Sequence, residues 1–443
     1  MKTIIVGGGV AGMTTAYRLM QQGHEVELYE ASPYLGGLVR TFEVGGNRLE
    51  AYYHHIFSTD TTIIRLIKEL GLGEKLNWIE SKVGWFDNGK IYPFVTAIDL
   101  LRFAPLPLID RVKLGLMAVR LRGREEWAEF EHITCKDWIE KNVSKKVFEK
   151  MWGPLLEGKY GDAYDQVAMA WLWSKIHLRF QSREGGKEKL GYLAGSFAGY
   201  IDELERRLRA GGVKIATGVA VREITAENNR ANGIILADGT KIAGDAVVAA
   251  VPSLLFKNMA PPLTDDYVQR LDHVQWQGAV CMVLTMKHSL SSTYWMNIGD
   301  RTMPFLALVE HTNFIAPENY DGNHILYISN YLSQDHAYFS MSEDELWAIF
   351  EPALKRINPQ FSSEWVTQRW LFKAPYAQPI VRLDYSAHKP DHRTPVDGLY
   401  LETMTQIYPE DRGQNYSIKM GEEVAQMVTE DHARRAPHPT AAP

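Results

Sequence analysis

The spacing of apolar residues changes twice within the first 30 residues of the chain. Residues 3–6 are consecutive and mostly β-branched, as is typical of a buried parallel strand. Residues 13–22 carry apolar side chains at helical spacing, and Gly23 follows as a helix-ending residue. Residues 24–30 alternate between polar and apolar side chains, which favours a second strand. The pattern predicts a β–α–β unit at the start of the chain.

Three glycines stand between the first predicted strand and the helix. Gly7, Gly9 and Gly12 have the spacing G-x-G-x-x-G, with Val10 and Ala11 before the third glycine. In such a unit the first glycine permits a tight turn, the second lets the backbone approach a pyrophosphate, and the third lets helix and strand pack closely. The start of the helix offers free N–H groups to the phosphates. The sequence therefore predicts a dinucleotide bound by residues 7–12.

An acid and a second glycine pair follow the second predicted strand. Glu30 lies 18 residues after Gly12, where its carboxylate would accept the hydroxyls of the adenosine ribose. Ala31 comes next, and Gly36 and Gly37 follow. Nicotinamide-binding domains do not need this second pair, whereas a flavin dinucleotide needs a tight passage beside its pyrophosphate and ribityl chain. We therefore expect FAD as the cofactor.

The string E-A-x-x-x-x-G-G-x-x-x-T at residues 30–41 resembles the flavin-containing amine oxidase superfamily, which includes protoporphyrinogen oxidases, phytoene desaturase-like enzymes and UDP-galactopyranose mutases. Many members carry arginine just before and just after the glycine pair, whereas this chain has Tyr34 and Leu38. We expect Arg40 to supply the cation instead. Gly36, Gly37 and Leu38 are implied cofactor contacts.

Two later segments extend the resemblance. Residues 218–224 match a G-x-x-V-x-x-I stretch that returns to the FAD domain, and the resemblance implies that Val221 contacts adenine through its backbone. Near the end, a predicted strand at 398–401 leads to Gly413 and a helix, whose start at Asn415 and Tyr416 would face the flavin pyrimidine ring. The acid usual after this strand is not obvious, because Met404 stands near its place.

The resemblance implies an α/β fold with two domains. We expect a discontinuous, Rossmann-like FAD-binding domain with a parallel sheet, made of residues 1–84, 190–262 and 395–430. Residues 85–189 and 263–394 would form the substrate-binding domain, with a helical part and an antiparallel sheet that roofs the flavin. Residues 431–443, rich in Pro, Ala and His towards their end, are expected to be a disordered tail.

A histidine pair is the most unusual feature beside the expected flavin. His54 and His55 stand in the string Y-Y-H-H-I-F-S-T-D, whose H-I-F-x-T part is similar to a galactopyranose mutase string that passes close to the reactive face of the flavin. His55 is the first candidate for orienting substrate, accepting a proton or contacting the flavin through its backbone, and His54 is the second. A hydrogen-bonded histidine in a packed loop is an equally open interpretation.

The expected chemistry follows from what the motifs contain. No second G-x-G-x-x-G for NAD(P)H and no redox C-x-x-x-x-C occurs, so electrons would come directly from a small organic substrate. Cys281 stands where amine oxidases often carry a flavin-facing lysine, which disfavours amine oxidation. We expect an FAD-dependent oxidoreductase that transfers a hydride from a substrate C–H bond to flavin N5. The alternative is a redox-neutral isomerase resembling UDP-galactopyranose mutase.

Composition limits the binding partners and the cellular compartment that we expect for this chain. The chain has 48 Lys and Arg against 54 Asp and Glu, a formal net charge of −6, and nothing in it favours nucleic acid. Cys135 and Cys281 are far apart and form no metal-binding motif, so we expect no metal and a cytoplasmic location. Residues 95–119 are apolar but interrupted by charges and prolines. A membrane span is not expected, whereas peripheral membrane contact and the oligomeric state stay open.

Overall fold

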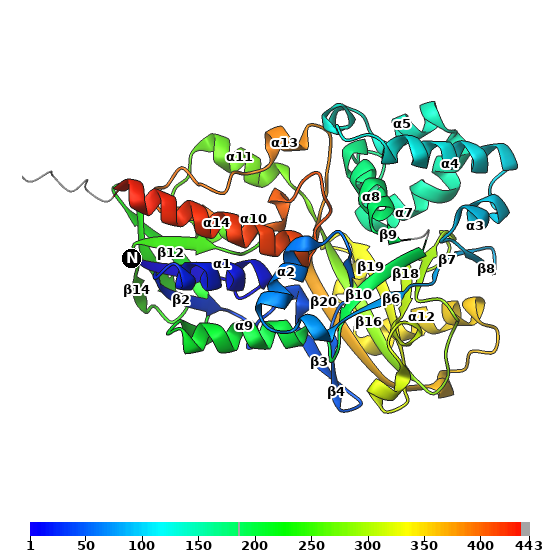
Figure 1. Ribbon diagram of the computed structural model, residues 1–443, viewed down its shortest axis with the longest axis horizontal. Helices are drawn as coiled ribbons and strands as arrows, with labels where there is room; N and C mark the ends of the chain where they lie inside the picture. Colours follow the sequence, from blue (N-terminus) through cyan, green and yellow to red (C-terminus); the bar gives the residue numbers. More distant parts are fainter. Residues whose placement is uncertain (185–186, 436–443) are drawn as a thin grey trace, which may run out of the picture.

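A five-stranded parallel sheet forms the centre of the first domain. The computed structural model describes residues 1–184 and 187–435. All neighbouring strands in this sheet run parallel, in the order β11 (Lys214–Thr217), β2 (Glu25–Glu30), β1 (Lys2–Val6), β15 (Ala246–Ala249) and β21 (Leu399–Leu401). The predicted α/β fold class with a discontinuous parallel sheet is therefore confirmed (Figure 1).

The two faces of this sheet pack against different layers, as the alternation of side chains along a strand requires. Ile5 packs with helices α1 (Val10–Gln21), α9 (Ala198–Ala210) and α14 (Gln414–Arg435). Ile4 and Val6 pack on the opposite side with the three-stranded sheet of β12 (Val221–Glu227), β13 (Arg230–Leu236) and β14 (Lys241–Ala243). The first domain therefore has three layers, with the helices on one face of the parallel sheet and the antiparallel sheet of β12, β13 and β14 on the other.

The boundary expected at residue 263 is wrong by one helix. Helix α10 (Ser253–Met259) is followed by α11 (Asp265–His273), whose Tyr267 and Leu271 are buried against Ile4 and Val247 of the parallel sheet. Because these apolar side chains belong to the core of the first domain, the change of domain occurs near Val274.

The second domain is built on a seven-stranded sheet. Its strands are, in order, β20 (Val366–Pro379), β16 (Trp276–Met286), β19 (His324–Leu332), β18 (Ala307–Glu310), β17 (Trp295–Ile298), β7 (Val83–Asp87) and β8 (Lys90–Pro93). Every pair is antiparallel except β7 with β17, so the expected antiparallel sheet is mixed.

Strand β16 is buried on both faces and joins the two domains. Its Val280, Met282 and Leu284 pack under helix α12 (Glu343–Ile357), whereas Cys281 and Val283 face the core shared with the first domain. The sheet therefore stands between α12 and the nucleotide-binding side, as Figure 1 shows for α12 at the lower right.

A helical part with its own core covers one end of this sheet. It comprises α3 (Ala97–Arg102), α4 (Leu108–Arg122), α5 (Cys135–Asn142), α6 (Lys145–Val147), α7 (Gly153–Tyr160) and α8 (Met169–Gln181), at the upper right of Figure 1. Across residues 1–184 and 187–435, no helix combines the length and the apolar character needed to cross a bilayer.

Short elements link the two domains. They are the hairpin of β3 (Thr41–Val44) and β4 (Asn47–Glu50), helix α2 (Thr61–Glu69), the short helix α13 (Tyr385–His388), and a small sheet in which β10 (Lys187–Leu193) pairs with β5 (Ile56–Phe57), β6 (Leu76–Glu80) and β9 (Arg183–Glu184). The loop between β4 and β5 carries both histidines.

The expected tail is partly wrong, because α14 continues through Asp431 to Arg435. Residues 436–443 of that tail lie outside the described residues.

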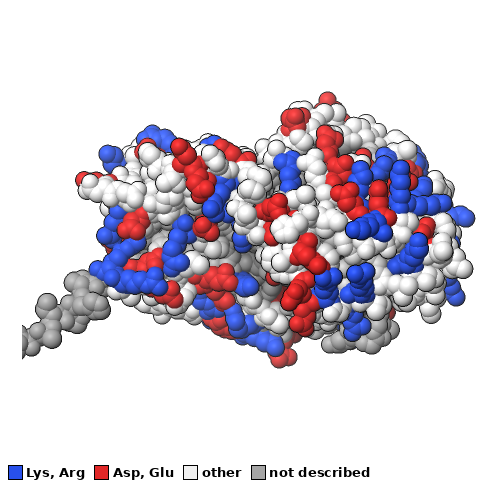
Figure 2. All heavy atoms as spheres, turned by 90° about the horizontal axis from the view of Figure 1, so that it is seen from above, with Lys and Arg blue, Asp and Glu red and all other residues white. Residues whose placement is uncertain are grey.

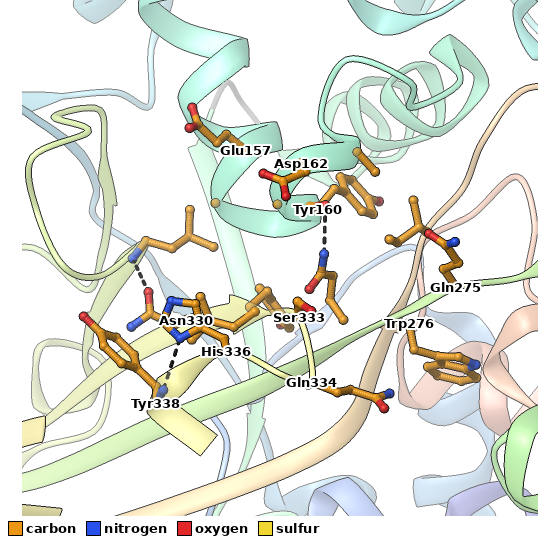
Figure 3. Close-up of a pocket in the computed structure, with 18 of the residues that line it drawn as sticks. Glu157, Tyr160, Asp162, Gln275, Trp276, Asn330, Ser333, Gln334, His336 and Tyr338 are labelled. Atoms are coloured by element: carbon orange, nitrogen blue, oxygen red, sulfur yellow. Dashed lines mark hydrogen bonds between the residues drawn. The ribbon is translucent and has the colours of Figure 1, made fainter. Parts of the chain in front are cut away.

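A pocket of about 930 Å³ opens between α7 and the seven-stranded sheet. Figure 3 shows Glu157, Tyr160 and Asp162 on one wall, facing Asn330, Ser333 and His336 on the other. Tyr331 and Gln277 also line it, and Gln277 donates a hydrogen bond to the carbonyl of Tyr160 (2.8 Å). Its size falls in the range of small-molecule sites.

Candidate active site

The glycine loop after β1 has the backbone that the sequence predicts. Gly7 has φ of +110°, and a Cβ there would lie 2.4 Å from the carbonyl oxygen of Ala250. A Cβ on Gly12 would lie 2.2 Å from the Gly7 carbonyl oxygen. A Cβ on Gly9 would meet nothing within 4 Å. Gly7 and Gly12 are therefore required for packing, whereas Gly9 leaves its side of the loop open.

Helix α1 begins directly after this loop with its N–H groups available. Gly9 is the N-cap residue, no side chain of the described chain caps it, and the first turn contains Val10, Ala11 and Gly12 but no acid. An uncapped start of a 12-residue helix presents unpaired N–H donors and a partial positive charge. These groups suit a phosphate.

Glu30 and the second glycine pair lie against the same loop. The Gly8 N–H donates to Glu30 Oε2 (2.6 Å), and the Ser32 N–H donates to Glu30 Oε1 (2.7 Å). The Gly36 N–H donates to the Gly8 carbonyl (2.8 Å), and a Cβ on Gly37 would lie 3.2 Å from the Gly9 Cα. The structure thus brings together predicted residues that are up to 30 positions apart.

The neighbours of these residues have different surroundings. Ala31 is exposed beside Glu30. Leu38 packs with Tyr52 and with small side chains of β16 and β20, Ala279 and Ala374 among them. The Arg40 guanidinium lies 5.7 Å from the centre of the Phe372 ring, on β20. Leu38 and Arg40 therefore reach towards the second domain, and the phosphate contact expected of Arg40 stays a prediction.

The returning segment runs beside β2. The Gly218 and Val219 N–H groups donate to the carbonyls of Ser32 (2.8 Å) and Glu30 (2.9 Å). Val221 begins β12 two residues later. This pairing places the segment at the predicted adenosine end of the site, and the adenine contact of Val221 stays a prediction.

Glu402 was missed by the sequence analysis, which looked for the acid near Met404. It directly follows β21, is 1% exposed, and accepts a hydrogen bond from Thr15 of α1 through Oε1. Within the described residues, its Oε2 has no hydrogen-bond partner. Burial raises the pKa of Glu402 to about 7, against the opposing effect of the Thr15 hydrogen bond. The available signal was its place at the carboxyl end of a parallel strand.

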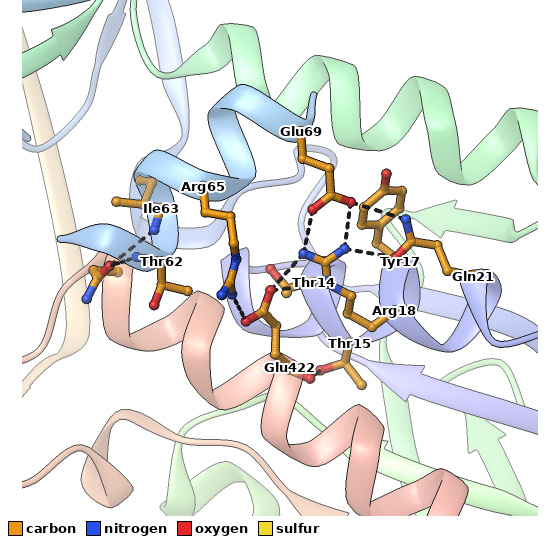
Figure 4. Close-up of polar contacts among 12 residues, drawn as sticks. Thr14, Thr15, Tyr17, Arg18, Gln21, Thr62, Ile63, Arg65, Glu69 and Glu422 are labelled. Carbon is orange, nitrogen blue, oxygen red and sulfur yellow. Dashed lines mark hydrogen bonds and ion pairs between the residues drawn. The ribbon is translucent and has the colours of Figure 1, made fainter. Parts of the chain in front are cut away.

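The start of α14 is held against α1 and α2 (Figure 4). Gly413 accepts the first helical hydrogen bond, from the Ser417 N–H (3.0 Å), and a Cβ on Gly421 would lie 2.7 Å from the Ala11 carbonyl oxygen. Asn415 Oδ1 accepts from the N–H groups of Thr62 and Ile63 (3.0 and 3.1 Å). The Asn415 side chain therefore caps α2, which leaves its backbone for the predicted cofactor contact. Tyr416, half-buried in the same turn, stays a predicted contact.

Salt bridges fix the same three helices on their outer side. Arg18 of α1 pairs with Glu69 of α2 (2.6 Å) and with Glu422 of α14 (2.7 Å), and Arg65 also pairs with Glu422 (Figure 4). The glycine loop and the start of α14 are thus held in one rigid arrangement.

A cationic cluster lies in front of α14, and the sequence analysis assigned it no role. Asp411 accepts from Lys159 of α7 (2.6 Å) and Lys175 of α8 (2.5 Å). Arg412 donates to Gln378 (3.2 Å) and to the Tyr331 hydroxyl. Burial by itself would raise the pKa of Asp411, but Lys159, Lys175 and Arg412 hold it well below its usual range. The cluster therefore has three cations for one carboxylate.

The histidine pair is held neutral by burial. His54 Nδ1 lies 2.6 Å from the Tyr52 carbonyl oxygen, and His55 Nδ1 lies 3.1 Å from the Tyr294 hydroxyl. Burial lowers the pKa of His54 to about 4 and that of His55 to about 3, and nearby cations add to both effects. The His55 ring also packs edge-on against Phe57 and Trp295. Both rings are half-buried, and packing accounts for part of their role.

These residues fit FAD. The uncapped start of α1 suits the pyrophosphate, Glu30 and the segment at 218–221 suit the adenosine, and the unpaired Glu402 Oε2 can accept from a ribityl hydroxyl. Between the glycine pair and the sheet of the second domain, Leu38, Tyr52 and Tyr331 pack on the buried alanines Ala279, Ala374 and Ala377.

Comparison with known proteins agrees with this geometry. The family model for flavin containing amine oxidoreductases matches residues 10–408. A 15-cis-phytoene desaturase from Solanum lycopersicum is 23% identical over 436 residues, which cover 90% of this chain and 73% of that protein. Both phytoene desaturase-like enzymes and this family were expected from the motifs.

Solved structures share the fold. An oxidoreductase from Methanosarcina mazei has a TM-score of 0.72 at 22% identity, covering 97% of this chain and all of that one (100%). Reduced UDP-galactopyranose mutase has a TM-score of 0.74 at 15% identity, covering 97% and 95%. Since the family model spans most of the chain and the site fits its cofactor, the chain belongs to the flavin containing amine oxidoreductase family and is an FAD-dependent oxidoreductase.

Proposed function

We propose that a small organic substrate binds in the 930 Å³ pocket and is dehydrogenated at a carbon–carbon bond. The observation that supports this most directly is Tyr331. It lines the pocket, and its hydroxyl accepts from Arg412, the residue before Gly413 and α14. Tyr331 therefore connects the pocket with the segment before α14, where the flavin is predicted to bind. FAD would supply the hydride acceptor, flavin N5.

The polar lining of the pocket supports a substrate with polar groups. Carboxylates of Glu157, Asp162 and Asp335 line it together with the cations Arg301 and Arg382. Charged groups on opposite walls can orient such a substrate through hydrogen bonds. A long, purely apolar substrate would leave these groups desolvated at a cost.

The environment of Cys281 supports dehydrogenation of carbon over oxidation of an amine. Its thiol is 1% exposed in the core of β16, and burial raises its pKa above the usual range. A neutral thiol cannot provide the charged, water-holding group that amine oxidases often place here. Amine substrates are therefore expected to react slowly.

His55 is the proposed acceptor of the substrate proton, and since it is not among the residues that line the 930 Å³ pocket, the substrate must extend beyond that pocket to reach it. Its Nδ1 faces the Tyr294 hydroxyl, which leaves Nε2 for the substrate. The low pKa of His55, about 3, keeps the imidazole neutral but makes it a weak base at physiological pH, so a proton that it accepts would pass quickly to water. His54, whose Nδ1 is held by the Tyr52 carbonyl, would position His55.

The isomerase alternative has less support. Such an isomerase would need arginines to bind the diphosphate of its substrate, and the loose candidates are Arg369 and Arg382. Arg369 pairs with Glu343 and Asp344 of α12. Only Arg382 lines the pocket, where it donates to Gln275 (2.7 Å).

A cytoplasmic location stays a prediction, supported by two unpaired and buried cysteines, Cys135 and Cys281.

Anaerobic mixing tests the proposal. The FAD-loaded full chain would be mixed with panels of pocket-sized carboxylic acids, alcohols, isoprenoids and amines, while the oxidised flavin band is followed. Bleaching by a carbon donor but not by amines supports dehydrogenation. Turnover of a sugar nucleotide only after reduction with dithionite would instead establish the isomerase.

A further inference from the structure

Helix α4 has an outward-facing apolar side. Leu108, Ile109, Val112, Leu116 and Val119 are each between 47% and 66% exposed. At about 100° per residue, these five positions fall within an arc of about 100° on the helix. Leu114, Met117 and Leu121 lie on the opposite side and are buried in the core of the helical part. The helix is therefore apolar on its inner and its outer side.

Helix α3 extends this surface. Ile98 and Leu101 are 59% and 48% exposed, and α3 contacts α4, with Leu100 next to Gly115. The Arg111 side chain donates to the carbonyls of Leu101 and Leu106, which fixes the turn between the two helices. We call these seven exposed residues, Ile98, Leu101, Leu108, Ile109, Val112, Leu116 and Val119, the α3–α4 apolar face.

Basic side chains border the apolar face on both sides. On the helical wheel of α4, Lys113 and Arg120 lie about 20–40° beyond one edge of the apolar arc, and Arg111 and Arg122 lie about 40–60° beyond the other. Lys113, Arg120 and Arg122 are exposed. Figure 2 shows Lys and Arg gathered over this end of the molecule.

Carboxylates are kept away from the same surface. The two acids between residues 97 and 122 are Asp99, half-buried while it caps α3, and Asp110, buried. An apolar strip bordered by cations and free of exposed acids matches the interface of a bilayer with anionic headgroups, where apolar side chains enter the acyl boundary and cations stay with the phosphates.

We propose that the α3–α4 apolar face docks the protein on the surface of an anionic lipid bilayer. The occupant is a membrane and not a soluble partner, because the exposed apolar strip runs along α4 with basic residues on both of its sides, as in helices that lie in a bilayer interface. The helix enters the interface on its side and does not span it. This proposal does not depend on the reaction proposed above.

Vesicle co-sedimentation of the FAD-loaded full chain tests it. The vesicles would contain phosphatidylcholine alone or mixed with phosphatidylglycerol. The protein should sediment with the mixed vesicles, and salt should weaken binding. Ile109→Gln with Leu116→Gln should reduce binding roughly ten-fold or more, and Arg120→Gln about five-fold. Both changes are on exposed positions, so flavin absorbance and thermal stability should not change.

Leu255→Gln is the matched control, since Leu255 is an exposed apolar residue (38%) on α10 of the other domain. It should bind vesicles like the native chain. The proposal is overturned if the native chain ignores mixed vesicles, or if the double variant binds as well as the native chain. It is also overturned if light scattering shows a dimer that the double variant dissociates, because the face would then be an interface between two copies.

Discussion

Replacing Glu402 with glutamine should affect folding stability and cofactor binding in opposite directions. In the cofactor-free chain the Glu402 carboxyl is 1% exposed, and only Oε1 has a described partner, the Thr15 hydroxyl. Burying a carboxylate with half of its acceptors unused is costly, which is why burial raises its pKa to about 7. Glu402→Gln removes this charge and keeps an oxygen that can accept from Thr15.

The pH dependence gives the magnitude. The carboxyl's pKa rises from 4.5 in the unfolded chain to about 7 in the folded one. The folded state therefore holds its proton more tightly, and this carboxyl costs stability as pH rises through that interval. The cost is about 3 kcal/mol at pH 8 and under about 1 kcal/mol at pH 5. Relative to the native chain, the free energy of unfolding of the variant should thus increase by about 2.5 kcal/mol between pH 5 and pH 8.

Urea unfolding of the flavin-free chain at both pH values measures this gain. Using the difference between the two pH values removes any pH-independent cost of burying the amide. Glu74→Gln, at an exposed position, is the control and should give the same difference as the native chain. FAD titration should show weaker binding to Glu402→Gln, because the ribityl hydroxyl loses its charged acceptor. A pH-independent change in stability, or unchanged FAD affinity, would refute the reasoning.

Three further predictions follow from the site. Gly12→Ala should unfold the loop and lower the melting temperature, since its Cβ would lie 2.2 Å from a carbonyl oxygen, whereas Gly9→Ala should keep the native melting temperature and weaken FAD binding. Asp411→Asn should lower the free energy of unfolding in denaturant by about 3–5 kcal/mol, because it leaves two lysines without their buried partner. Asp202→Asn, which breaks an exposed ion pair, should lower it by under about 1 kcal/mol. The buried imidazoles stay neutral while unfolded ones protonate below about pH 6.5, so stability should fall as pH drops from there towards 4. His55→Asn should flatten that fall in unfolding midpoints, and an unchanged profile would exclude His55 as its source.

The sequence predicted the nucleotide-binding end in detail because its requirements are local. Gly7 is restricted by its positive φ and by the approach of the Ala250 carbonyl, and Gly12 by the approach of the Gly7 carbonyl, and such constraints exclude any residue that has a Cβ. Glu30 lies at the end of an alternating strand, so its position follows from spacing alone. Glu402 directly follows a predicted strand and could have been found in the same way, but the acid was expected near Met404.

The cluster around Asp411 could not be predicted from local sequence patterns. Asp411 meets Lys159 across 252 positions of sequence, and each residue alone resembles an ordinary surface charge. The boundary at α11 was missed for the same reason, because Tyr267 and Leu271 are apolar in either domain and only packing assigns them to the first. The end of α14 was missed because Asp431 stabilises it through Arg393, another distant partner (2.8 Å).

Under the proposed function, the side chains of the 930 Å³ pocket and not the cofactor site determine which substrate reacts. The predicted contacts of the cofactor are mainly to backbone groups, which few sequences can place correctly, so the sequence alone indicates the cofactor. The pocket is lined by side chains from α7, β16 and the segment after β19, which are brought together only by the fold. Ser333 and His336 are exposed, so their substitution should leave the glycine loop and the core untouched and change the substrate while FAD binding persists. Exchanging residues of this wall, with flavin absorbance as the control, is therefore the direct route from the known cofactor to the unknown substrate.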